Sequence, residues 1–192
     1  MTKPQPPLKP LVRARDASEW RAWLAKHHRT ATEAWLVLHT KASGKRSVPY
    51  NDAVDEALCF GWIDSVVKPL GAGARAQRCS PRRRGSPVSE VNRARVRRLV
   101  REGRMTPAGL QALPGVDQWL DPPPLVVAKD IERRIRGDPR AWAHYQRLPE
   151  AYKRIRVGWI EGARSRPEEF ERRLAHFIRK TARGERFGMV QG

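Results

Sequence analysis

Residues that favour β-strands gather at three places in the first half of the chain. The segment 34–41 is rich in β-forming residues and apolar on both alternating faces, which is typical of a central strand. Segments 62–68 and 75–80 also have strand character, and the glycine-rich turn 71–74 joins them. The pattern therefore predicts a small three-stranded sheet, antiparallel or mixed.

Helical spacing of apolar residues covers most of the remaining chain. One helix is expected after a capping box at residues 16–19, and another from residue 51 to the strand at 62. Further helices are predicted at residues 90–103, 106–113, 125–136, 139–146, 150–164 and 167–183. Helices packed on one small sheet and followed by a helical C-terminal region indicate an α+β fold.

Proline and glycine positions divide the chain into four segments. Residues 1–13 are predicted to be a flexible basic arm, residues 14–113 the α+β domain, and residues 125–192 the helical C-terminal region. Residues 114–124 include three consecutive prolines and are predicted to be an extended linker.

Charge is the strongest compositional feature. The formal net charge is +19 and the isoelectric point is about 11.3, so the surface attracts polyanions or anionic membranes. Because arginine greatly outnumbers lysine, an arginine-rich genome explains the same charge equally well.

Location and cofactors follow from what the sequence lacks. No run reaches the about 18 apolar residues of a membrane span, and the first residues lack the apolar part of a signal peptide. Two cysteines, Cys59 and Cys79, form neither a disulfide framework nor a zinc-ligand spacing. We therefore expect a cytoplasmic protein without a membrane span, a metal or another cofactor.

The candidate ligand site lies between residues 57 and 92, where an acid on a strand, an arginine cluster and an asparagine come close in sequence. Arginine suits an anionic ligand because its planar guanidinium binds carboxylate or phosphate with two hydrogen bonds. The strand pattern further predicts that Arg78 meets Asp64 across the strand pair. The candidate ligand-binding residues are Trp62, Asp64, Arg78, Arg82, Arg83, Ser86 and Asn92. The alternative is a structural network of the same residues that binds nothing.

Two other functions fit parts of the same region. The first is nucleic-acid binding along the basic helix 89–104 and the arginine triplet at residues 82–84. The phosphate contacts would come from Arg84, Arg93, Arg97, Arg101 and Arg104. An ordinary solvent-exposed helix face explains these arginines as well. The second is an enzyme that uses Asp64 as acid or base. No nucleophile, zinc spacing or dinucleotide fingerprint accompanies Asp64, so we do not expect catalysis.

Several motifs resemble one known family. These are the run 53–64, the Ser-Pro-Arg-Arg at 80–83, Asn92, the run 103–109, and C-terminal positions that include Trp142 and Trp159. Over about residues 16–184 the chain resembles the YdeI/OmpD-associated, bacteriocin-protection family. The resemblance implies a small α+β bacterial protein without an established catalytic activity, which acts in stress or bacteriocin protection by binding an anionic small molecule or a protein partner.

Overall fold

The computed structural model describes residues 8–113 and 115–188, which divide into two units. The N-terminal unit comprises Met1–Ser86 and Arg98–Val116, and the C-terminal unit comprises Pro87–Arg97 and Asp117–Gly192. Parts of the predicted arm, linker and C-terminal region, namely residues 1–7, 114 and 189–192, lie outside the described residues.

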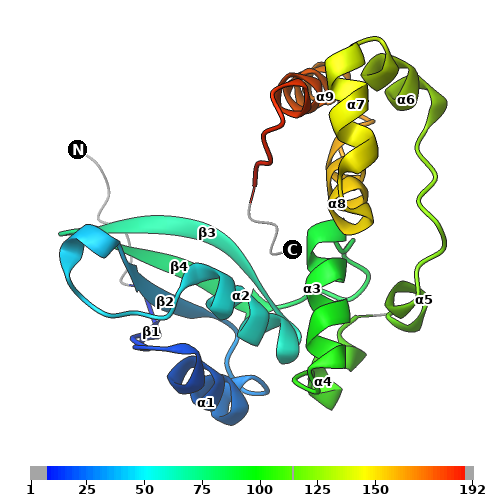
Figure 1. Ribbon diagram of the computed structural model, residues 1–192. Coiled ribbons are helices and arrows are strands. Elements are labelled where there is room, and N and C mark those ends of the chain that lie inside the picture. Colours follow the sequence, from blue (N-terminus) through cyan, green and yellow to red (C-terminus); the bar gives the residue numbers. More distant parts are fainter. Residues whose placement is uncertain (1–7, 114, 189–192) are drawn as a thin grey trace. The chain divides into compact units, whose positions relative to one another are not determined.

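The N-terminal unit is built on a mixed sheet with the strand order β1-β2-β4-β3 (Figure 1). The inner strands are β2 (Ala34–His39) and β4 (Ala74–Pro81), and β3 (Trp62–Gly71) is antiparallel to β4 at one edge. At the other edge β1 (Leu11–Val12) pairs in parallel with β2. The α+β class is confirmed. The fourth strand was not predicted, because it has only two residues and lies directly after a proline-rich segment.

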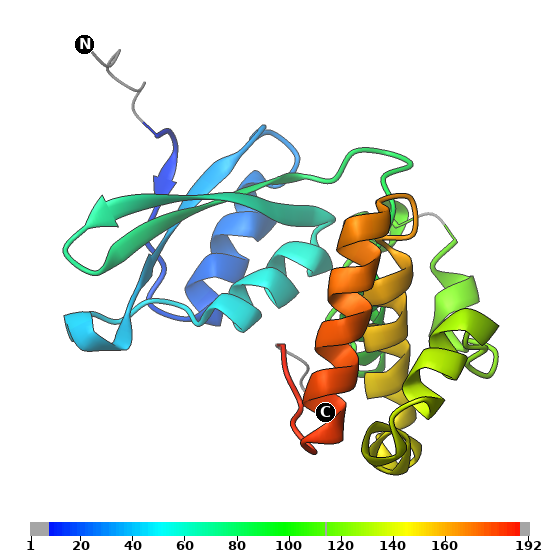
Figure 2. The ribbon, with the colours of Figure 1, turned by 90° about the horizontal axis from the view of Figure 1, so that it is seen from above.

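Helices α1 (Ala17–His27) and α2 (Tyr50–Cys59) lie side by side on the sheet in both ribbon views (Figures 1 and 2). The predicted cap of α1 is confirmed, because the Asp16 carboxylate accepts a hydrogen bond from the Glu19 backbone N–H at 3.0 Å. A short 3₁₀ turn, η1 (Lys41–Ser43), follows β2. The helices and the sheet share one core, which includes Trp20, Leu24, Leu36, Leu58 and Trp62.

Helix α4 (Pro107–Gln111) approaches the end of α2 at backbone contact distance. The Thr106 hydroxyl donates to the Cys59 carbonyl at 2.6 Å and accepts from the Gly109 N–H at 3.1 Å, so Thr106 is the N-cap of α4. A Cβ atom on Gly109 would lie 2.2 Å from the Cys59 oxygen. Glycine is therefore required at this position by the close approach of the two helices.

Both cysteines are buried in the N-terminal unit. Burial, together with the charge of Glu56, raises the pKa of Cys59 to about 11, and burial raises the pKa of Cys79 to about 12. Because the thiolate is the reactive form, we predict that neither thiol reacts with a disulfide reagent at pH 8 in the folded protein and that both react in urea. Rapid labelling of the folded protein would contradict this assignment.

The C-terminal unit is helical. It contains α5 (Asp117–Leu120), α6 (Lys129–Arg136), α7 (Pro139–Arg147), α8 (Glu150–Glu161) and α9 (Pro167–Ala182). Its own core includes Ile131, Ile135, Tyr145, Ile160, Leu174 and Phe177. Helix α3 (Glu90–Arg101) crosses the division, with residues 90–97 in this unit and residues 98–101 in the other. In the described part of the chain, no helix has both the length and the apolar composition needed to cross a membrane.

Candidate functional site

The predicted pairing of Arg78 with Asp64 is wrong. In the sheet Asp64 lies opposite Cys79, so these two side chains share one face. Arg78 precedes Cys79 in β4 and lies opposite Trp35 of β2, so its side chain points to the other face. The Arg78 guanidinium instead donates to Glu33 at 2.7 Å. The Asp64 carboxylate accepts a hydrogen bond from the Tyr50 hydroxyl at 2.7 Å.

The arginine loop after β4 uses its polar groups for internal contacts. Arg82 is only 8% exposed; its guanidinium donates to the Ser86 carbonyl at 3.0 Å, and its backbone N–H donates to Gly61 at 2.9 Å. The Ser86 hydroxyl donates to the Arg83 carbonyl at 2.7 Å. Trp62 is buried, and its indole N–H donates to the His28 carbonyl at 3.3 Å. These contacts support the structural alternative more than an open ligand site.

Asn92 belongs to the C-terminal unit, whereas the other predicted ligand residues belong to the N-terminal unit. Its backbone N–H donates to the Ser89 hydroxyl at 3.4 Å at the start of α3. The single-site arrangement of these residues stays a prediction.

Most of the predicted nucleic-acid-binding arginines on α3 and in the segment after it contact a carboxylate or an aromatic ring. Arg97 pairs with Glu90 at 2.7 Å, and Arg93 stacks on the Trp119 ring at 4.9 Å. Arg104 pairs with Glu56 at 2.6 Å and with Glu102 at 2.9 Å. Side chains that already have such partners must release them before they bind phosphates. Arg84 and Arg101 are exposed.

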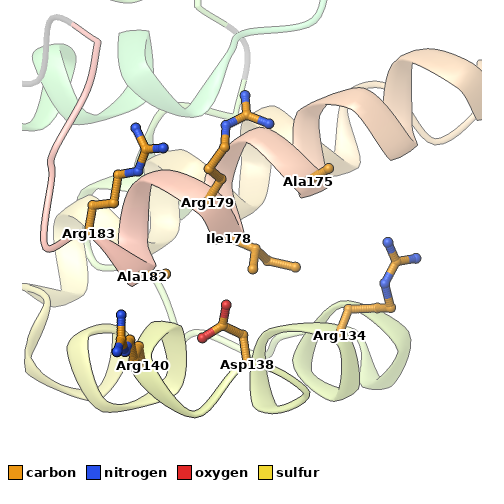
Figure 3. A pocket seen from close by; sticks show the side chains of 8 residues that line it. All are labelled: Arg134, Asp138, Arg140, Ala175, Ile178, Arg179, Ala182 and Arg183. Atoms are coloured by element: carbon orange, nitrogen blue, oxygen red, sulfur yellow. The ribbon is translucent and has the colours of Figure 1, made fainter.

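One hollow of the C-terminal unit lies between α9 on one side and α6 and the start of α7 on the other (Figure 3). We call it the α9 groove. It has a volume of about 490 Å³ and is lined by Arg134, Asp138, Arg140, Ala175, Ile178, Arg179, Ala182 and Arg183. The α9 residues recur at spacings of three and four, so they share one helix face. Two alanines on that face leave room between the helices.

The floor and the rim of the α9 groove differ in chemistry. Figure 3 shows Ile178 and Asp138 turned into the space between the helices, whereas Arg179 and Arg183 leave α9 side by side, away from Asp138. The Asp138 carboxylate accepts a hydrogen bond from the Ala141 N–H at 2.9 Å and so caps α7. The groove therefore has an apolar floor with one acid and a basic rim.

The rim arginines are less neutralised than most arginines in the protein. Arg134 pairs with Glu171 at 3.0 Å. Within the described ranges, Arg140, Arg179 and Arg183 have no carboxylate oxygen within 4 Å; Arg179 donates to His176 at 3.3 Å. Burial and the charge of Arg179 lower the pKa of His176, which keeps this imidazole neutral and able to accept. Three rim cations thus remain available to an external anion.

A second basic hollow lies in the N-terminal unit, around the end of β2 and the start of α2. Its volume is about 700 Å³. Its lining includes the basic residues Arg15, Lys41, Lys45, Arg46 and Arg75 and the acids Asp16 and Asp52. It contains none of the predicted ligand residues, although Tyr50, which bonds Asp64, is part of its wall.

Sequence reasoning missed both hollows. The predicted site was chosen from residues that are close in sequence, whereas the α9 groove joins α9 to residues of α6 and α7, with the whole of α8 between them in the sequence. One signal was present: Arg179 and Arg183 lie one turn apart beside Ala175 and Ala182, on a helix whose opposite positions are apolar. The helical period alone does not reveal which second helix faces that stripe.

Comparisons with known proteins divide the chain between residues 112 and 124, and one boundary between the two structural units lies in the same interval, after Val116. A family model described as "Domain of unknown function (DUF8412)" matches residues 12–112. Another, described as "Bacteriocin-protection, YdeI or OmpD-Associated", matches residues 124–184. The inferred resemblance is thus confirmed for the C-terminal part, while the motifs before residue 112 fall in the first match. No curated protein and no solved structure matches the chain.

Proposed function

We propose a binding function for this chain, which belongs to the family described as a domain of unknown function (DUF8412) and carries a bacteriocin-protection, YdeI or OmpD-associated domain at residues 124–184. In this proposal the α9 groove receives an acidic segment of a partner protein. The contact is non-catalytic and serves stress or bacteriocin protection in the bacterial cytoplasm.

The observation that carries the proposal is the apolar floor inside a basic rim. A small dianion in the hollow would meet the Asp138 carboxylate, which repels it. A peptide segment avoids this cost, because one apolar side chain can cover Ile178 while carboxylates reach the rim arginines. The volume of about 490 Å³ is enough for a few side chains. Grooves between helices commonly bind amphipathic segments in this way.

The location in the chain supports the same groove. All of its lining residues lie between 134 and 183, inside the 124–184 match. The basic hollow of the N-terminal unit has a larger volume, but its two acids, Asp16 and Asp52, stand among its cations. It therefore provides the matched control for the α9 groove.

A labelled peptide with leucine at every fourth position and glutamate elsewhere tests the proposal by fluorescence anisotropy. We expect the peptide to bind, and its glutamine analogue to bind at least about tenfold more weakly, because rim charge pairs are lost. The double variant Arg179→Gln/Arg183→Gln should lose a similar factor. The double variant Lys45→Gln/Arg46→Gln, with the same change of charge in the other hollow, should bind like the wild type.

Three outcomes would contradict the proposal. Equal loss in both double variants would mean that only net charge matters. Loss confined to Lys45→Gln/Arg46→Gln would move the site to the N-terminal unit. Tighter binding of duplex DNA than of the peptide, with an affinity that falls steeply as salt rises, would favour the nucleic-acid function.

A further inference from the structure

The hollow of the N-terminal unit has more positive charge in its wall than its acids neutralise. Its volume of about 700 Å³ lies within the range of about 300–1,000 Å³ that is common for small-molecule sites. One of its cations, Arg15, pairs with Glu19 at 2.6 Å. Within the described ranges, the other four have no carboxylate oxygen within 4 Å; they are Lys41, Lys45, Arg46 and Arg75.

These four cations come from the loop after β2 and from β4. Lys41 lies in η1, and Lys45 and Arg46 follow it in the loop to α2. In the sheet Arg75 lies opposite Leu38, which belongs to the core beneath α1 and α2, so the Arg75 side chain is on the helix-covered face. All four residues are exposed, so a ligand that enters from solvent meets them directly.

Hydrogen bonds hold the loop that carries three of the cations. Near its start, the His39 N–H donates to the Ser47 hydroxyl at 2.8 Å. At its end, the Val48 N–H donates to the Ala14 carbonyl at 3.0 Å, and Val48 is only 1% exposed. Because the loop is already fixed at both ends, a ligand does not have to order it, and binding loses less conformational entropy.

The two acids of the hollow lie on its helix side. Asp16 precedes α1, and Asp52 lies in the first turn of α2. The Ser18 hydroxyl and the Glu19 N–H both donate to Oδ1 of Asp16, and within the described ranges Oδ2 accepts no hydrogen bond. Carboxylates repel a bare phosphate ion, but they accept hydrogen bonds from hydroxyl groups. The wall therefore suits a ligand that has a phosphate at one end and hydroxyl groups at the other.

We propose that this hollow binds a phosphorylated sugar, either free or as part of a nucleotide. Lys45, Arg46 and Arg75 hold the phosphate, since a guanidinium binds it with two hydrogen bonds. Asp16 and Asp52 accept hydrogen bonds from the sugar hydroxyls. The site lies in the other unit from the α9 groove and does not depend on the function proposed for that groove.

Isothermal titration calorimetry of the full chain with ribose 5-phosphate, inorganic phosphate and ribose tests the site. We expect ribose 5-phosphate to bind at least about tenfold more tightly than either fragment, because it contacts both the cations and the acids. In Lys45→Gln/Arg46→Gln, which replaces two exposed side chains, its affinity should fall at least about tenfold. The matched double variant Arg179→Gln/Arg183→Gln removes the same charge from the α9 groove and should bind ribose 5-phosphate like the wild type.

Asp52→Ala separates recognition of the sugar from general attraction of anions. Without this carboxylate, the preference for ribose 5-phosphate over inorganic phosphate should fall at least about threefold. Adenosine 5′-monophosphate identifies the form of the ligand: tighter binding than ribose 5-phosphate indicates a nucleotide, and weaker binding a free sugar phosphate. The proposal is overturned by equal affinities for ribose 5-phosphate and inorganic phosphate, by no binding of ribose 5-phosphate, by equal losses in the two double variants, or by an unchanged preference in Asp52→Ala.

Discussion

Replacement of Glu56 by alanine is expected to cost the N-terminal unit about 3 kcal/mol of unfolding free energy. The Glu56 carboxylate is 4% exposed and accepts from Arg21 at 2.7 Å and from Arg104 at 2.6 Å. Its removal leaves two arginines without their shared partner. Both arginine side chains are about one-third exposed, at 37% and 33%, so water recovers part of the loss. We therefore expect the low end of the range for a broken buried ion pair.

Glu102→Ala is the matched control for Glu56. Glu102 also binds two arginines, Arg98 at 3.0 Å and Arg104 at 2.9 Å, but its side chain is 37% exposed. Exposed pairs contribute about 0–1 kcal/mol, so this variant should remain close to the wild type. Urea unfolding followed by tryptophan fluorescence measures both changes. Equal small losses in the two variants would show that the buried network adds little to stability.

This network also shows why the partners of the arginines were not predicted while the fold largely was. The helices and the three main strands follow from periodicity, caps and turn residues, which are local properties of the sequence. The partners of the arginines are not local. Arg78 binds Glu33, 45 positions earlier, and Arg104 binds Glu56, 48 positions earlier. A cluster of arginines in sequence therefore says little about which of them remain available to a ligand.

The sheet shows the same limit in its register. Alternation in β4 predicts that Gln77 and Cys79 share one face, and both are indeed buried. Between the turn and Asp64 the register of β3 and β4 shifts twice, between Pro69 and Gly71 and between Asp64 and Val67. Each such irregularity changes the offset of the two strands by one position. Counting residues from the turn therefore does not give the partner of Asp64, and the predicted pairing was wrong although the strand was correct.

Gly109→Ala is expected to destabilise the N-terminal unit by about 2–3 kcal/mol, the usual cost of an overpacked core. At an ordinary helix position the same change stabilises by about 0.5–1 kcal/mol. Here the new Cβ would lie 2.2 Å from the Cys59 oxygen and 2.7 Å from the Cys59 carbonyl carbon. Both are backbone atoms, so no side-chain rotation relieves the overlap. Helix α4 must move away from α2 instead.

That movement also weakens the contacts that fasten α4. The Cys59 carbonyl accepts from the Thr106 hydroxyl at 2.6 Å and from the Thr106 N–H at 3.1 Å. Two controls isolate the effect in urea unfolding. Gln111→Ala changes an exposed position of the same helix, and Gly137→Ala adds a Cβ no closer than 3.4 Å to its neighbours at a φ of −63°. Neither should lose more than about 0.5 kcal/mol. A gain in stability for Gly109→Ala would mean that α4 does not pack against α2 at this distance.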